Sequence, residues 1–208
     1  MRSSMEAENV EHKLIVLGNQ GVGKTALVTR LVYDVFEDIN TSTIGMDFFT
    51  KTIFLEDRPI RFKMWDTAGQ ERFHCLLPAY LRDSTIALIV YDITKKASFD
   101  DVSNWMLKIR SERGNNVVII LIGNKSDAHA NRQVEYEEAL TKAEMMNISF
   151  IETSAKTGAN INELLQMILF PEQPYLRPYH TIEKTWKEKI LLGGGSASQH
   201  SLNKRCSC

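Results

Sequence analysis

Eight residues near the N-terminus form a pattern that could hold phosphate groups. The stretch from Gly18 to Thr25 reads GNQGVGKT and fits the pattern G-x-x-x-x-G-K-[ST]. It follows the apolar run Leu14–Leu17 and precedes Ala26–Leu31, which we expect to be helical. In this strand, loop and helix context, backbone N–H groups converge on anionic oxygens, and the helix N-terminus adds partial positive charge. An ordinary glycine-rich turn is the alternative, and the flanking pattern argues against it.

The side chains of this loop would have distinct roles toward a nucleotide. Lys24 is placed to reach the β- and γ-phosphates, and the hydroxyl of Thr25 is placed to ligate Mg²⁺. The loop alone therefore predicts a nucleotide phosphate with Mg²⁺ and leaves the base of the nucleotide open. The residues of the loop that we expect to contact the nucleotide are Gln20, Gly21, Val22, Gly23, Lys24, Thr25 and Ala26.

A second polar block, from Asp66 to Gly69, reads DTAG and follows a predicted strand directly. An acidic side chain at the carboxyl end of a strand, beside a phosphate loop, is where a Mg²⁺ partner belongs. Because Mg²⁺ keeps several waters, Asp66 can act through one of them. Gly69 would let its backbone N–H approach a γ-phosphate closely. A D-x-x-G sequence on its own fits a surface turn equally well, and the position after the phosphate loop favours the metal site.

A third block, Asn124-Lys125-Ser126-Asp127, predicts which base is bound. An ionised Asp127 carboxylate only accepts hydrogen bonds, and guanine presents N1–H and N2–H₂ side by side as donors. Adenine would leave this carboxylate unpaired, and an unpaired buried group discriminates strongly between ligands. Lys125 can lay its methylene stem over the base, and Asn124 would tie this segment to the phosphate loop. A solvated polar loop is the alternative interpretation.

A fourth block, from Thr153 to Lys156, closes the last predicted strand and reads TSAK. The backbone N–H of Ala155 could bind O6 of guanine, with Ser154 and Lys156 beside it. This short block is a weak signal alone. Its position after the other three blocks strengthens its assignment to the nucleotide site.

The elements that must position these blocks alternate along the chain. Short apolar runs, typical of strands buried on both faces, occur at Leu14–Leu17, Ala87–Tyr91, Val117–Ile122 and Ser149–Glu152. Two further strands, Phe48–Leu55 and Ile60–Trp65, flank the turn sequence EDRP and predict an antiparallel hairpin at the sheet edge. Helical patterns lie at Phe99–Glu112, Glu135–Met146 and Ile161–Leu169. We therefore expect an α/β fold with a mostly parallel six-stranded sheet, one antiparallel edge strand, and helices on both faces.

Composition and length narrow the class of protein and its division into domains. The chain has 208 residues, 43% of them hydrophobic, and a net charge of −1, which argues against a general nucleic-acid binder. No apolar run is long enough to span a bilayer, and the first residues lack the apolar stretch of a signal peptide, so we expect a cytosolic protein. We expect a flexible N-terminus over residues 1–11, one nucleotide-binding domain over 12–170 and a flexible tail over 171–208. Within the tail, Ile182–Leu192 could form a short amphipathic helix.

The four blocks, in this order and each at a predicted strand end, resemble those of the small Ras-like GTPases. Within that group the chain resembles the Rab family, and most closely its Golgi-associated subgroup. The segments that carry the resemblance are Ser42–Phe48 (STIGMDF), Trp65–Phe73 (WDTAGQERF), Tyr91–Thr94 (YDIT), Leu55–Asp57 (LED), Leu81–Thr85 (LRDST), Ile151–Lys156 (IETSAK) and the terminal Cys206-Ser207-Cys208.

The resemblance implies roles for further residues. Thr43 would ligate Mg²⁺ through its hydroxyl and touch the γ-phosphate only in the GTP state. Gln70 would be the catalytic residue that positions the attacking water, and Phe36 would pack edge-on against guanine. The residues of the implied effector surface are Ile44, Phe48, Trp65 and Tyr80. Phe36 and the three aromatic residues of that surface could instead belong to the core.

Three positions depart from the pattern of the group. Asn40 stands where many relatives carry a tyrosine over the phosphates, which bears on closure of the first switch. The segment 128–130 replaces the usual leucine after Asp127, and Gln20 stands where some relatives have glycine. We expect slow intrinsic hydrolysis, because no arginine is placed to stabilise the transition state in cis. An activating protein would supply that charge in trans, with a gain of about 10³–10⁵ in rate.

The two cysteines at the end of the tail predict a lipid anchor and a set of partners. Cys206 and Cys208 lie too close in sequence for an easy disulfide, and in a Rab-like chain they imply double geranylgeranylation. Two lipid chains anchor stably where one binds marginally, and Lys204 and Arg205 would add attraction to anionic lipid. The implied partners are effectors, an exchange factor, an activating protein, a GDP-dissociation inhibitor and a prenylation escort protein, with no nucleic acid. We expect a monomer on the cytosolic face of endomembranes, at the Golgi, and in the cytosol when the lipid is masked.

Other interpretations remain open at this point. A nucleotide-bound interaction module deficient in hydrolysis would fit Asn40, while a P-loop ATPase or kinase would fit the phosphate loop but not Asp127. A metal site at the adjacent His74 and Cys75 lacks a second pair of ligands. We expect His12 to be a solvated residue before the first strand.

Overall fold

The structure is a computed structural model. It describes residues 10–37, 43, 45–55, 58–67 and 77–170. Several residues singled out in the sequence therefore lie outside the described part of the chain: Asn40, Ile44, Gly69, Gln70, His74, Cys75, Cys206, Cys208 and the tail segment 182–192.

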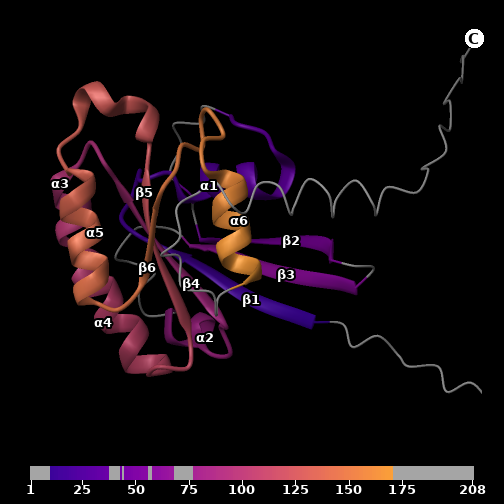
Figure 1. Ribbon diagram of the computed structural model, residues 1–208. Helices are drawn as coiled ribbons and strands as arrows, with labels where there is room; N and C mark the ends of the chain where they lie inside the picture. Colours follow the sequence, from indigo (N-terminus) through magenta and orange to yellow (C-terminus); the bar gives the residue numbers. More distant parts are fainter. Residues whose placement is uncertain (1–9, 38–42, 44, 56–57, 68–76, 171–208) are drawn as a thin grey trace, which may run out of the picture.

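A six-stranded sheet forms the centre of the described molecule (Figure 1). Its strands are β1 (Val10–Leu17), β2 (Met46–Leu55), β3 (Arg58–Thr67), β4 (Ile86–Asp92), β5 (Val118–Asn124) and β6 (Ser149–Glu152). They lie in the order β2-β3-β1-β4-β5-β6. The edge strand β2 pairs antiparallel with β3, and all other neighbours pair in parallel. The predicted α/β fold with one antiparallel edge strand is confirmed.

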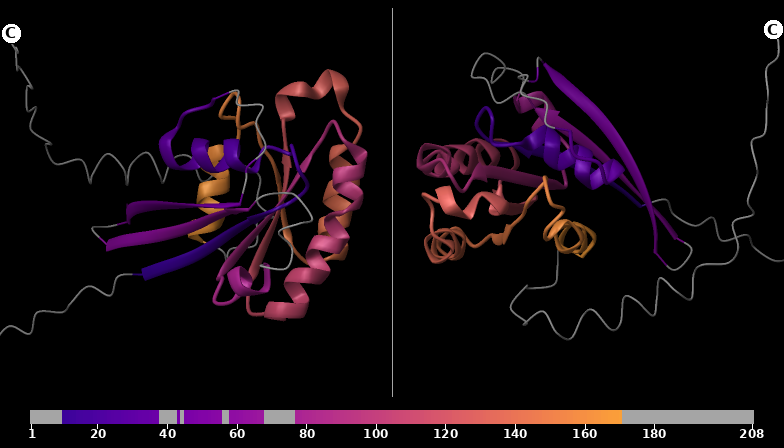
Figure 2. Two further views of the ribbon diagram at one scale, coloured as in Figure 1. Left: turned by 180° about the vertical axis from the view of Figure 1, so that it is seen from behind. Right: turned by 90° about the horizontal axis from the view of Figure 1, so that it is seen from above.

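Helices cover both faces of this sheet (Figure 2). They are α1 (Lys24–Tyr33), α2 (Leu77–Leu81), α3 (Lys96–Asp100), α4 (Val102–Arg113), α5 (Tyr136–Met145) and α6 (Ile161–Leu169), with a 3₁₀ segment at Ser126–Asn131. None of those helices, within the ranges that the structure describes, is both long and apolar enough to cross a membrane.

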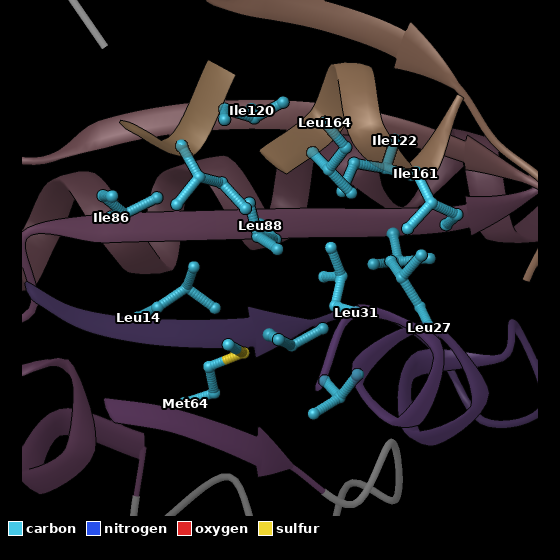
Figure 3. Packing of buried hydrophobic residues seen from close by; sticks show 14 of the residues in the cluster. Leu14, Leu27, Leu31, Met64, Ile86, Leu88, Ile120, Ile122, Ile161 and Leu164 are labelled. Atoms are coloured by element: carbon cyan, nitrogen blue, oxygen red, sulfur yellow. The ribbon is translucent and has the colours of Figure 1, made fainter. Parts of the chain in front are cut away.

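The central strands are buried on both sides, so each contributes to two hydrophobic cores. Successive side chains of a strand point to opposite faces, and Leu14 and Val16 accordingly belong to one core while Ile15 and Leu17 belong to the other. The first core lies under α1 and α6, and the second lies under α2, α4 and α5. Figure 3 shows the first core, with these labelled side chains: Leu14, Leu27, Leu31, Met64, Ile86, Leu88, Ile120, Ile122, Ile161 and Leu164.

Two expectations about elements were wrong. The predicted helix Phe99–Glu112 is two helices, α3 and α4, which meet at Asp101. Strand β1 begins at Val10, so His12 is not a solvated residue ahead of the strand. Parallel pairing with β3 extends β1 by placing His12 opposite Phe62, and the two rings stack with their centroids 5.5 Å apart.

Candidate nucleotide-binding site

The polar blocks of the sequence meet at one edge of the sheet. Strands β1, β3, β4, β5 and β6 run parallel, so their carboxyl ends lie together. The phosphate loop follows β1, Asp66 stands near the end of β3, Asn124 ends β5, and the block from Thr153 follows β6. Such an edge is where ligands bind in sheets of this kind.

Two glycines of the phosphate loop stand where no side chain fits. A Cβ atom on Gly18 would lie 2.1 Å from the carbonyl oxygen of Val90, and Gly18 has φ 142°. A Cβ atom on Gly23, which has φ 92°, would lie 2.5 Å from Nδ2 of Asn124. The loop is therefore packed against β4 and against the third block, and its glycines permit that close approach.

Lys24 is the buried cation of this loop, with 6% of its surface exposed. Its Nζ donates to the carbonyl oxygens of Gly18 (2.9 Å) and Asn19 (3.0 Å). Burial lowers the pKa of Lys24 to about 8, and the nearby Asp66 opposes that shift. A buried ammonium held by neutral carbonyls gains from an anionic partner, so the position fits a phosphate group.

The three residues expected to hold Mg²⁺ form one hydrogen-bonded cluster. Thr25 Oγ1 donates to Asp66 Oδ2 at 2.5 Å and lies 2.8 Å from Thr43 Oγ1. Because the single hydroxyl proton of Thr25 is given to Asp66, Thr43 must donate to Thr25.

Among the described residues, the other carboxylate oxygen of this cluster has no hydrogen-bond partner. Asp66 is fully buried, its Oδ1 accepts no hydrogen bond from the described part of the chain, and burial raises the pKa of Asp66 to about 6. Hydroxyl and carboxylate oxygens are the ligands that Mg²⁺ prefers, and an unpaired buried oxygen suits the ion or a water bound to it. These residues therefore fit the metal.

Asn124 joins three of the blocks. Its Nδ2 donates to the carbonyl oxygen of Val22 at 2.9 Å, as expected for a tie to the phosphate loop. Its Oδ1 accepts from the backbone N–H of Ala155 at 3.2 Å. This N–H was expected to bind guanine O6, so in this structure O6 would have to share it with Asn124 or replace that contact.

Lys125 and Asp127 tie the third block to the segments around it. Lys125 Nζ donates to the carbonyl oxygen of Gly21 at 2.8 Å and pairs with Asp92 Oδ2 at 2.7 Å. Asp127 Oδ1 accepts from Ser154 Oγ at 2.5 Å. The lysine stem therefore runs alongside the phosphate loop, and the third and fourth blocks are held together.

Two contacts at the site were missed from the sequence. Arg30 of α1 donates to the carbonyl oxygens of Ala155 (2.8 Å) and Lys156 (2.9 Å), which anchors the fourth block. Arg132 forms a two-bond pair with Glu152 at 2.6 and 2.8 Å, which joins the segment after the third block to the end of β6. Neither arginine lies in a recognisable motif, so only the fold reveals these contacts.

The remaining predicted site residues lie apart from the polar cluster. Phe36 is partly buried and packs against the first core. Phe48 of β2, Trp65 of β3 and Tyr80 of α2 form a row of touching rings, with centroids 5.0 Å apart for the first pair and 5.1 Å for the second. Half of the Phe48 surface is exposed, whereas Trp65 and Tyr80 are partly buried and pack against the second core.

Comparison with protein families matches residues 13–170 to the Ras family. The matched span includes all four polar blocks and every strand at the site edge. Ras-family GTPases bind GTP or GDP with Mg²⁺, in agreement with the buried lysine and the oxygen cluster described above. The chain therefore belongs to the Ras family of small GTPases.

Proposed function

We propose that this protein is a Rab-type GTPase, a switch that cycles between GTP and GDP and regulates vesicle traffic at the Golgi. The observation that carries the switch is the hydrogen-bonded cluster of Thr25, Thr43 and Asp66, and the Rab assignment rests on the sequence segments that resemble that family. It connects Thr43, which precedes β2, to the fixed phosphate loop. Loss of the γ-phosphate would therefore act on the β2–β3 hairpin through Thr43.

The chemistry follows from the residues placed around the phosphates. Water attacks the γ-phosphorus, the bond to the β–γ bridging oxygen breaks, and GDP and phosphate are released. Lys24 offsets the charge that develops on the β- and γ-oxygens, and Gln70 orients the attacking water. Mg²⁺, when bound, neutralises charge on the phosphate oxygens, and it would be held by Thr25, Thr43 and Asp66. The backbone N–H of Gly69 would contact the γ-phosphate.

The register of the hairpin explains how the nucleotide state would reach a partner. Asp47 pairs with Asp66, and the next pair along the hairpin is Phe48 with Trp65. The aromatic row of Phe48, Trp65 and Tyr80 thus begins one residue pair away from the metal cluster. We assign effector binding to this row, together with Ile44.

Partner capture tests this assignment. Full-length protein loaded with a non-hydrolysable GTP analogue should retain effectors that the GDP-loaded protein does not retain, and Phe48→Ala should abolish the difference. Phe54→Ala is the matched control, because Phe54 is 72% exposed on the same strand and lies outside the row. Equal capture by both nucleotide forms of the unaltered protein would contradict the proposal.

The membrane part of the proposal rests on Cys206 and Cys208. Both would carry geranylgeranyl groups, and a GDP-dissociation inhibitor would mask them in the cytosol. Incubation with geranylgeranyl transferase should modify the protein twice, and only when the Rab escort protein is present. Modification of Cys206→Ser/Cys208→Ser, or modification without the escort protein, would refute the lipid assignment.

A hydrolysis-deficient interaction module is the second candidate. Asn40 favours it, because many relatives of the GTPase group carry a tyrosine over the phosphates at that position. Lys24, Thr25, Thr43, Asp66 and Gln70 argue against it, since a module that never hydrolyses GTP has no need of the complete set.

A further inference from the structure

The side chain of Asn19 connects the phosphate loop to the helices that follow β4. Its Nδ2 donates to Asp101 Oδ2 at 2.5 Å, and its Oδ1 accepts from the indole Nε1–H of Trp105 at 2.8 Å. Rotating the amide by half a turn would place its oxygen against a carboxylate and its NH₂ against an N–H donor. The contacts therefore allow only one orientation of Asn19. We call these three residues the Asn19 bridge.

The break between α3 and α4 creates the acceptor side of the bridge. Asp101 is the junction residue, and Trp105 follows four positions later, so both side chains lie on one face of the helix. The backbone N–H of Trp105 donates to the Asp101 carbonyl at 3.1 Å. Asn104 Nδ2 donates to the second carboxylate oxygen of Asp101 at 3.2 Å. Trp105 is 5% exposed, so the bridge is anchored in the second core.

The bridge is joined to residues that we expect to contact the nucleotide. The carbonyl oxygen of Asn19 accepts from Lys24 Nζ at 3.0 Å. Its neighbour Gly18 has the positive φ and the close approach to Val90 described above. A shift of Asn19 would therefore move both the acceptor of the phosphate-binding lysine and the start of the loop.

We propose that Asn19, Asp101 and Trp105 act as positioning residues that hold the phosphate loop in its nucleotide-binding conformation and slow nucleotide release. A loop already fixed in the bound conformation loses less freedom on binding, and the bridge supplies that fixation from outside the ligand contacts. The proposal rests on the guanine-nucleotide binding of the Ras family, and it is independent of the Rab assignment.

Release of fluorescently labelled GDP from the full-length protein with Mg²⁺ tests the bridge. Trp105→Phe keeps an aromatic ring in the core, and it removes the indole N–H together with part of the buried ring volume. We expect release to become about three- to tenfold faster, the range that corresponds to loss of one such hydrogen bond. Leu107→Ala on the exposed side of α4, where Leu107 is 68% exposed, should leave the release rate unchanged. Release from Trp105→Phe at the rate of the unaltered protein would overturn the proposal.

An exchange of the amide and carboxylate separates positioning from general stability. Asn19→Asp sets two carboxylates against each other and should speed release. Adding Asp101→Asn restores an amide that donates to a carboxylate, and that carboxylate still accepts from Trp105. The double variant should release GDP within about twofold of the unaltered rate, and release as fast as in Asn19→Asp alone would contradict the bridge.

The indole resonance of Trp105 gives a readout independent of the nucleotide. The chain has three tryptophans, so Trp105→Phe assigns the signal in a ¹⁵N spectrum. In Asn19→Ala the Trp105 indole N–H resonance should shift, and its proton should exchange with solvent faster. In the double variant Asn19→Asp/Asp101→Asn, both changes should be reversed. An unchanged Trp105 signal in Asn19→Ala would show that the bridge does not form in solution.

Discussion

At the scale of single residues, we expect Asp127 to select the base. Its carboxylate oxygen Oδ1 accepts from Ser154 Oγ at 2.5 Å, which orients the side chain. Asp127→Asn should shift the preference from GTP toward XTP, because xanthine carries a carbonyl where guanine carries its amino group. We expect a loss of about 10²-fold or more in GTP affinity. Competition binding with labelled GDP measures it, and unchanged guanine selectivity would refute the base-recognition argument.

Asp66 shows the opposite demands of stability and function. Burial raises its folded pKa to about 6 from 3.8, so ionisation lowers the free energy of unfolding progressively as pH rises between these two values, and the full cost is present above about 6. In nucleotide-free protein at pH 8, Asp66→Asn should raise the free energy of unfolding by about 1 kcal/mol. The variant removes the cost of burying a charged carboxylate, and the cost of burying an unpaired amide offsets part of that gain.

The same substitution should weaken Mg²⁺-dependent GDP retention, since the metal loses its anionic ligand. Denaturant unfolding in a chelator and GDP release in Mg²⁺ measure the two effects on the same variant. A variant that is less stable without ligand and equally retentive with Mg²⁺ would contradict this account of Asp66.

At the scale of elements, the pair of Arg132 and Glu152 fastens the segment after β5 to the end of β6. The two side chains are only 18% and 10% exposed, so Arg132→Met leaves a nearly buried carboxylate unpaired. We expect a loss of about 2 kcal/mol in the free energy of unfolding, and Glu152→Met added to it should recover part of that loss.

Lys96→Met is the control for this prediction. Lys96 pairs with Glu138 in solvent, and removing it should cost less than about 1 kcal/mol. Equal losses in the free energy of unfolding for Arg132→Met and Lys96→Met, measured with urea, would show that the buried pair stabilises the protein no more than the exposed one.

Periodicity predicted the elements well where burial is regular. The helix Ile161–Leu169 has the predicted bounds, as does β6, since each has a sharp apolar pattern. The break at Asp101 was not predicted, because no proline or glycine marks it and the helical pattern continues across it. The proximity of Thr25 and Asp66 could be predicted, because their motifs stand at the carboxyl ends of parallel strands. The partners of Asn19 could not be predicted, because Asp101 stands 82 residues away and lies in no motif.

At the scale of the whole molecule, His12 links stability to pH. Burial against Phe62 lowers the pKa of His12 below 6.5. As pH falls from 7 to 5, the unfolded chain therefore binds more protons at this position than the folded protein does, and the contribution of His12 to the free energy of unfolding decreases, opposite in sign to that of Asp66. His12→Phe keeps a ring on Phe62 and should flatten that decrease. Urea unfolding at several pH values measures it.

His129→Phe is the matched control for the pH experiment. His129 is exposed on the 3₁₀ segment, so this variant controls for the replacement of a histidine by phenylalanine at a solvent-facing position. An equal decrease of stability with acid in His12→Phe and in the unaltered protein would refute the role of His12.

We expect the assembled site to hydrolyse GTP and so to act as a switch, and not to hold its nucleotide permanently. Single-turnover hydrolysis of GTP by the full-length protein, with Gln70→Leu as the matched variant, distinguishes the two. Bound GTP should convert slowly to GDP and phosphate, a Rab activating protein should accelerate the conversion strongly, and Gln70→Leu should lose both. Bound GTP that stays intact over many hours, with and without the activating protein, would contradict the switch and favour the interaction module.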